Sequence, residues 1–152
     1  MSETVIQVTS LGKRIKGKTI LEDISFEVNQ GDCVALIGPN GAGKTVLMSC
    51  ILGDKKPSSG QVLIDGKTGK AKNKIAVLLQ ENTIPNSLKV EELIAFFQSI
   101  SDNPLTNQEV QQLLQFKEDQ YQQFADKLSG GQRRLLAFVL CLIDKPKILF
   151  LD

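Results

Sequence analysis

One segment constrains the fold more than any other part of the chain: Gly38-Pro39-Asn40-Gly41-Ala42-Gly43-Lys44-Thr45. It follows an apolar run at residues 33–37 that predicts a buried strand, and it opens a predicted helix at residues 44–52, closed by Gly53. The pattern GxxxxGK[ST] between a strand and a helix is typical of loops that bind phosphates. Glycines let backbone amides approach a polyphosphate, Lys44 can reach its terminal phosphates, and the Thr45 hydroxyl can ligate Mg²⁺. The alternative is a glycine-rich turn without a ligand.

The chain contains no histidine among its 152 residues. This excludes Ser-His-Asp and Cys-His catalysis, histidine-ligated zinc and the HExxH metalloprotease helix. Lys and Arg number 18 against 17 Asp and Glu, so no basic excess favours nucleic acid as a partner. Catalysis would have to use carboxylates, lysine, backbone amides or a metal held by oxygen.

Two further patterns concern location. Cys33, Cys50 and Cys141 lack a CxxC spacing and have apolar neighbours, which indicates three small buried residues in a reducing compartment rather than disulfides or a zinc site. We see no signal peptide, and the longest apolar run, at residues 135–143, is much shorter than the ~20 residues of a membrane span. A membrane role would need other subunits.

The regions before and after residues 81–126 predict strands, and residues 81–126 predict helices. Alternating patterns predict strands at 5–8, 24–28 and 61–64, with a turn at Asp65-Gly66, and residues 74–79 look like a more buried strand. Residues 148–151, like 33–37, suit the middle of a parallel sheet.

Residues 81–126 carry 2 basic and 8 acidic side chains and predict a helical insertion. Its first helix falls at residues 90–97, and Thr106 would cap a second helix with Glu109 completing a capping box. We favour a solvated helix face over an interaction tail for the acidic residues.

A second motif, Leu128-Ser129-Gly130-Gly131-Gln132, precedes a predicted helix at residues 133–143. Ser129 and Gln132 fit a capping box, but an ordinary capped helix does not explain two glycines, which are poor helix formers. The glycines make sense if backbone amides must closely approach an anion.

This pentapeptide resembles the signature motif of ABC ATPases, the nucleotide-binding subunits of ATP-binding cassette transporters. The phosphate loop lies upstream in the family's order, Gln80 ends a strand as the Q-loop glutamine does, and residues 147–152 resemble the Walker B strand. Residues 57–66 are also similar to the family. The resemblance implies an α/β P-loop NTPase fold of the ABC type over residues 1–152, with an N-terminal antiparallel β subdomain. Its parts would be a β and P-loop core at 1–80, a helical subdomain at 81–127, and the signature helix and Walker B strand at 128–152.

The resemblance also implies a site and partners. In a head-to-tail homodimer or heterodimer, Ser129, Gly130 and Gly131, beside Gln132, would bind the γ-phosphate of the partner's ATP. Lys44, Gln80 and Asp152 would be the catalytic residues, and Thr45, Gln80 and Asp152 would arrange Mg²⁺. The helical subdomain would face transmembrane permease subunits, with residues 80–85 as its hinge. These implications place the protein in the cytoplasm at the periphery of the cell membrane, without nucleic acid.

The sequence departs from the family pattern at three points. Ile15 aligns with an aromatic ring that stacks on adenine, so we expect weak adenine selectivity. Val46, within the nucleotide-binding stretch, replaces a common second hydroxyl, with little expected effect. The catalytic glutamate, the switch histidine and a strand between the Walker A and Walker B strands are not in the sequence, so we expect the N-terminal part of an ABC ATPase, C-terminally incomplete.

Three functions remain open. The leading one is the ATPase subunit of a membrane transporter. The others are an ABC ATPase acting in translation or DNA repair, and a nucleotide-binding remnant without activity. For the 152 residues alone we expect neither ATP-driven dimerisation nor hydrolysis at family-like rates.

Overall fold

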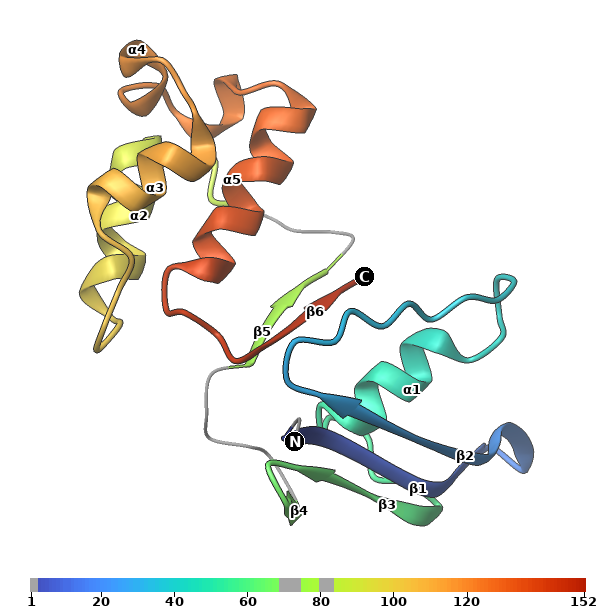
Figure 1. The fold of residues 1–152 in the computed structure, drawn as a ribbon. Coiled ribbons are helices and arrows are strands. Elements are labelled where there is room, and N and C mark those ends of the chain that lie inside the picture. The colour runs from blue at the N-terminus through green and yellow to red at the C-terminus, as the bar shows by residue number, and fades with distance from the viewer. Residues whose placement is uncertain (1–2, 69–74, 80–83) are drawn as a thin grey trace. The chain divides into compact units, whose positions relative to one another are not determined.

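The computed structural model describes residues 3–68, 75–79 and 84–152. The chain forms two compact units, Met1–Lys72 and Asn73–Asp152 (Figure 1). Each unit buries apolar side chains of its own. The phosphate loop belongs to the first unit, and the signature pentapeptide belongs to the second.

An antiparallel sheet and one helix make up the first unit. Its strands are β1 (Thr4–Ile15), β2 (Lys18–Asn29), β3 (Ser59–Ile64) and β4 (Lys67–Thr68), in the order β2-β1-β3-β4. Two-residue turns with positive φ join β1 to β2 at Lys16 and Gly17, and β3 to β4 at Asp65 and Gly66. Such turns suit the twist of a hairpin, and the second confirms the turn predicted at Asp65-Gly66.

The strands β1 and β2 are longer than the sequence pattern predicts. Register shifts interrupt their pairing, and Ser10 and Asp23 adopt positive φ beside these irregularities. Such bulges change which side of the sheet the next residues face, so the apolar alternation breaks while the strand continues.

Helix α1 (Lys44–Ile51) confirms the predicted helix after the phosphate loop, and Gly53 follows its end with a φ of 79°. The predicted buried strand at residues 33–37 is wrong. No strand forms there, and Val34 and Ile37 are 53% and 94% exposed. A strand of this kind needs hydrogen-bonded neighbours and a cover on both faces, and no strand of the first unit's described residues pairs with it.

The cysteine prediction is confirmed in part. Cys50 is buried and Cys141 is half-buried, but Cys33 is exposed because it lies in the unpaired segment. All three thiols are free.

The second unit combines a short parallel sheet with helices. Strands β5 (Ile75–Leu78) and β6 (Ile148–Leu151) pair in parallel, with Leu78 opposite Leu151. The sequence predicts a strand in both segments, but the described residues give a sheet of these two strands, so the predicted position of residues 148–151 in the middle of a sheet is not observed. The helices are α2 (Val90–Ser99), α3 (Asn107–Leu114), α4 (Glu118–Tyr121) and α5 (Gly130–Leu142), with a 3₁₀ turn η1 at Ala125–Lys127. In the described part of the chain, no helix is both long and apolar enough to span a bilayer.

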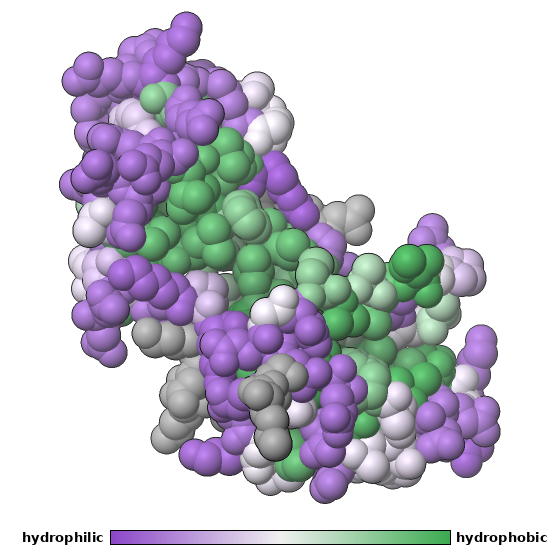
Figure 2. Space-filling view, in the orientation of Figure 1, coloured by the Kyte–Doolittle hydropathy of each residue, from purple (hydrophilic) through white to green (hydrophobic). Residues whose placement is uncertain are grey.

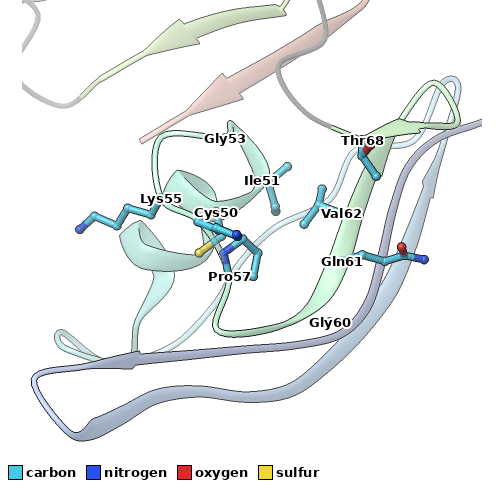
Figure 3. Close-up of a pocket in the computed structure, with 10 residues that line it drawn as sticks. Cys50, Ile51, Gly53, Lys55, Pro57, Gly60, Gln61, Val62 and Thr68 are labelled. Atoms are coloured by element: carbon cyan, nitrogen blue, oxygen red, sulfur yellow. The ribbon is translucent and has the colours of Figure 1, made fainter.

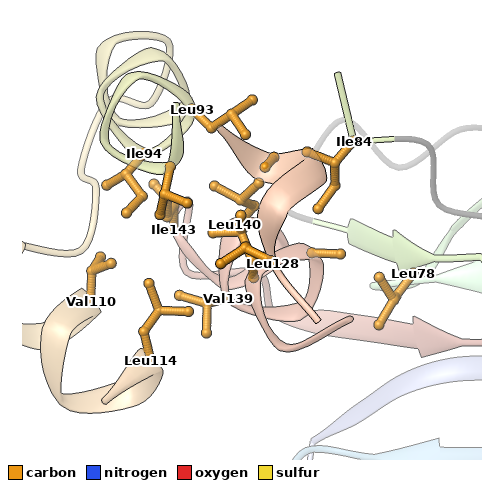
Figure 4. Packing of buried hydrophobic residues seen from close by; sticks show 14 residues of the cluster. Leu78, Ile84, Leu93, Ile94, Val110, Leu114, Leu128, Val139, Leu140 and Ile143 are labelled. Carbon is orange, nitrogen blue, oxygen red and sulfur yellow. The ribbon is translucent and has the colours of Figure 1, made fainter. Parts of the chain in front are cut away.

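Helix α5 shares one apolar core with α2 and α3 (Figure 4). Leu136 and Val139 of α5 are fully buried, and Leu93 and Val110 come from the neighbouring helices. The outer faces of the helices are hydrophilic, and the surface toward α5 is more apolar (Figure 2). The acidic side chains Glu91, Glu92, Glu118 and Asp119 are exposed, which agrees with a solvated helix face. The subdomain boundaries at residues 80 and 127 stay predictions.

Candidate functional site

The phosphate loop is an exposed turn whose shape depends on glycine. Gly41 and Gly43 have φ values of 82° and 91°, in the left-handed region that other residues adopt only with strain. The Ala42 amide donates a hydrogen bond to the Pro39 carbonyl (3.2 Å), which closes the turn. Gly38 to Ala42 are exposed, so the backbone of the loop is accessible to a ligand.

Gly43 also lets the start of α1 pack closely against the sheet. A Cβ at this position would lie 3.0 Å from Leu21 Cδ2 and 3.2 Å from Ile20 Cγ2, both on β2. A Cβ here would therefore be more crowded by β2 than most Cβ atoms are, and the neighbouring atoms would have to move to make room for it. This contact fixes where the helix N-terminus, and with it the loop, lies.

Lys44 is held over the loop by two of the loop's own carbonyl groups. Its Nζ donates to the Gly38 oxygen (2.6 Å) and to the Pro39 oxygen (2.8 Å). An ammonium group has three donors, so one N–H remains for a phosphate oxygen. Thr45 is exposed beside it in the first turn, and Val46 is half-buried.

In the described parts of the chain, the two helices that follow the motifs, α1 and α5, differ from the other α-helices in the charge of their first turns. Helices α2, α3 and α4 carry Glu or Asp in their first turns, whereas α1 and α5 carry none. An acidic side chain there would offset the partial positive charge of the helix N-terminus and repel a phosphate. The two helices that follow the motifs therefore keep this charge available to an anion.

The signature segment forms the predicted capping box. The Ser129 hydroxyl accepts a hydrogen bond from the Gln132 amide (3.2 Å), and the Gln132 side chain accepts one from the Ser129 amide (3.0 Å). Gly130 and Gly131 are exposed, and a Cβ at either would meet no atom within 4 Å. The packing of the second unit does not require glycine at these positions, so an incoming group is the better explanation for them.

A second capping box occurs as predicted at Thr106 and Glu109. The Thr106 backbone amide and hydroxyl donate to the Glu109 carboxylate at 2.7 and 3.0 Å. These bonds, the backbone bond above all, lower the pKa of Glu109 below its usual value. This capping box stabilises the start of α3, and neither of its residues belongs to the phosphate loop or the signature segment.

The carboxyl ends of β5 and β6 lie together. The Asp152 amide donates to the Leu78 carbonyl (2.9 Å). Gln80, which is expected to arrange Mg²⁺ together with Asp152, falls outside the described residues, as does most of the predicted hinge. The sequence reasoning missed Arg134, whose guanidinium donates to the main-chain oxygens of Leu79 and Asp152. Its position two residues after the pentapeptide was the only signal.

The predicted metal ligands fit Mg²⁺ by their chemistry. Thr45 offers a hydroxyl and Asp152 a carboxylate, both exposed, and Mg²⁺ prefers few protein oxygens together with phosphates and water. No cluster of three or more His, Cys, Asp or Glu occurs in the part of the chain that the structure describes.

The first unit also contains Ile15, the residue aligned with an adenine-stacking ring, and a cavity. Ile15 is half-buried at the end of β1, opposite Lys18 in the hairpin. A cavity of about 450 Å³ opens between the end of α1 and β3, where Cys50, Lys55 and Val62 line it (Figure 3). None of the predicted site residues lines this cavity, and burial raises the pKa of the Cys50 thiol.

Comparison with known proteins decides the family. A family model described as ABC transporter matches residues 21–152, which contain both motifs. The chain belongs to the ABC transporter family. Among its ABC relatives, the methionine import ATP-binding protein MetN of Legionella pneumophila (strain Paris) is 34% identical over 97% of this chain. The spermidine/putrescine import ATP-binding protein PotA of Protochlamydia amoebophila (strain UWE25) is 34% identical over 93% of it.

Solved ABC structures share the fold and confirm the predicted P-loop NTPase class. A structure described as the ATP binding subunit of an ABC transporter has a TM-score of 0.77 at 25% identity, and the match covers 98% of this chain and 66% of that one. CbiO1 from Clostridium perfringens has a TM-score of 0.81 at 24% identity, over 99% of this chain and 65% of that one. The chain spans 47% of the MetN relative and 40% of the PotA relative, about half their length.

Proposed function

We propose that this chain provides the ATP-binding part of an ABC transporter subunit and binds Mg·ATP at residues 38–46. The observation that carries the proposal is the exposed loop before α1, with Lys44 Nζ held by two loop carbonyls and one donor left over. Lys44 would bind the β- and γ-phosphates, and the loop amides would donate to them. Ile15 would lie against the adenine base.

In the proposed dimer, the signature segment binds the ATP of a second ABC subunit. Two observations support this: Gly130 and Gly131 face open space, and the positive end of α5 carries no acidic residue in its first turn. Ser129 and the two glycine amides would donate to the partner's γ-phosphate, with Gln132 holding Ser129 through the capping box. Either a homodimer or a heterodimer fits.

Magnesium would be arranged by Thr45, Gln80 and Asp152. When bound, it would neutralise charge on the phosphate oxygens during transfer to water. This chain's residues would orient the phosphates, and Lys44, Gln80 and Asp152 are the residues proposed to act in hydrolysis by the dimer.

The transport role rests on the family. The names of the relatives give different transported substrates, namely methionine, spermidine/putrescine and sulfate/thiosulfate. No transported substrate can therefore be assigned to this chain. We propose that the acidic helical region contacts transmembrane permease subunits, which places the protein at the cytoplasmic face of a membrane.

Titration with Mg·ATP tests the proposal. Hydrogen bonds to charged groups contribute about 1.5–3 kcal/mol, so Lys44→Ala is expected to weaken binding by roughly tenfold to a hundredfold. Lys55→Ala removes a cation from the same unit outside the loop and should leave the affinity unchanged. Absence of binding in the parent chain, or equal losses in the two variants, would contradict the proposed site.

A turnover assay addresses hydrolysis separately. The 152 residues contain no histidine. We therefore expect this chain alone to bind ATP but to hydrolyse it far more slowly than complete ABC ATPases. Family-like turnover by the 152 residues would refute that expectation.

A further inference from the structure

The turn between β1 and β2 fixes which side chain lies next to Ile15. Lys16 and Gly17 form this two-residue turn, with φ values of 50° and 80°, and Ile15 pairs directly with Lys18. Side chains of a directly opposite pair extend from the same face of a sheet, with Cβ atoms about 5 Å apart. Lys18 therefore lies beside the residue that the proposed function places against adenine.

The same face of the hairpin carries the start of α1. Lys18 and Ile20 are two residues apart on β2, so their side chains share a face. Ile20 Cγ2 would lie only 3.2 Å from a Cβ at Gly43, the residue immediately before α1. Lys18 thus extends from the face on which the phosphate loop enters α1, and the β1–β2 turn and this loop lie at the same end of the first unit (Figure 1).

A second lysine of this face already has a partner. Lys13 pairs with Leu21, whose Cδ2 also reaches the start of α1, and it lies two residues from Ile15. The Lys13 Nζ donates to the Lys56 carbonyl (2.5 Å). Lys18, in contrast, is exposed, and its side chain forms no hydrogen bond or ion pair with another residue that the structure describes. Its ammonium group is available to a ligand.

A nucleotide bound as proposed would extend from Ile15 to the phosphate loop. The base would lie at Ile15, and Lys44 and the loop amides would bind the β- and γ-phosphates. The α-phosphate joins these two ends, so it would pass the face from which Lys18 extends. A lysine suits this position, because it is a mobile point charge with three donors on a long stem.

We propose that Lys18 is a further nucleotide-binding residue, whose ammonium group binds the α-phosphate of the nucleotide held by the loop. The inference rests on the proposed function. It adds recognition of charge at the end of the nucleotide where Ile15 supplies no aromatic stacking. Because ATP, ADP and GTP all contain an α-phosphate, the contact depends neither on the base nor on the γ-phosphate.

Titrations of the 152-residue chain with ATP, ADP and GTP test the inference. Exposed charge pairs are weak, so we expect Lys18→Ala to reduce the affinity for all three nucleotides alike, by about threefold to fivefold at low salt. The ratio between parent and variant should fall toward one in about 1 M salt, where the screening length is about 3 Å. Lys18→Arg, which keeps the charge in place, should retain the parental affinity.

The matched control is Lys67→Ala, which removes an exposed lysine of the same unit. Lys67 lies on β4, three strands from β2 in the order β2-β1-β3-β4. At a spacing of about 4.8 Å per strand, this distance of about 14 Å exceeds the screening length of about 10 Å at 0.1 M salt. The control should bind all three nucleotides as the parent chain does.

Moving the charge by one residue separates a positioned contact from an effect of net charge. Combining Lys18→Ala with Thr19→Lys restores the net charge but places the ammonium group on the opposite face, since neighbouring residues of a strand alternate. This double variant should bind as weakly as Lys18→Ala, and recovery of the parental affinity would overturn the inference.

Three other outcomes are decisive. Unchanged affinities in Lys18→Ala would overturn the inference and leave the proposed function intact. A loss confined to ATP would also overturn it, because the contact would then be with the γ-phosphate. A parent chain that binds no nucleotide would refute the proposed function and the inference together.

Discussion

Replacing Gly43 by alanine should destabilise the first unit more than the same change at Gly41. Both glycines have positive φ, of 91° and 82°, so each substitution carries a similar conformational cost of about 1–2 kcal/mol. Only at Gly43 does the new Cβ meet neighbours, 3.0 Å from Leu21 Cδ2 and 3.3 Å from the Ile20 carbonyl oxygen. Leu21 is buried, and the carbonyl belongs to β2, so neither can move freely.

Overpacking of this kind costs about 1–3 kcal/mol beyond the backbone strain. For a unit of this size, 1 kcal/mol corresponds to a change of roughly 4–8 °C in Tm. We therefore expect Gly43→Ala to melt at least about 4 °C below Gly41→Ala. The assay is thermal and urea unfolding of the nucleotide-free chain, followed by circular dichroism, so that ligand binding does not contribute. Equal losses in the two variants would show that the start of α1 does not depend on close approach to β2.

Three further predictions test other parts of the structure. Because hydrogen bonds from Thr106 lower the folded-state pKa of Glu109 below 4.5, the carboxylate stabilises α3 above that pH and loses its effect as the pH falls through the folded-state pKa. Glu109→Gln should therefore show a smaller loss of stability in acid than the parent chain, and identical acid unfolding curves would contradict this. Ile15→Tyr should strengthen ATP binding about fivefold, from a stacking contribution of about 1 kcal/mol, and a strong preference of the parent chain for ATP over GTP would refute the reasoning. Maleimide should label Cys33 before Cys50 and Cys141, because Cys33 is exposed and burial raises the pKa of the other two thiols. Mass spectrometry after a short pulse measures the order of labelling, and slower labelling of Cys33 would show that residues 33–37 are buried.

Much of the site could be predicted from local sequence. The glycine-rich loop, the turn at Asp65-Gly66 and the capping boxes at Thr106 and Ser129 all formed as predicted. Each depends on contacts within a few residues, where the residue type alone decides which φ or which hydrogen bond is accessible. The family followed for the same reason, since two short motifs in the expected order identify it.

Tertiary structure decided what local sequence could not. Residues 33–37 have the composition of a central strand, yet a strand exists only where neighbours complete its hydrogen bonds, and no strand of the first unit's described residues pairs with them. Arg134 is one of two adjacent arginines, and only the packing of α5 beside β5 and β6 shows that it bridges the ends of both strands. Its acceptors lie 55 and 18 residues away in sequence, so no local pattern predicts the contact. Sequence alone thus determined the local conformation of each motif and the family, and the fold determined which segments find partners.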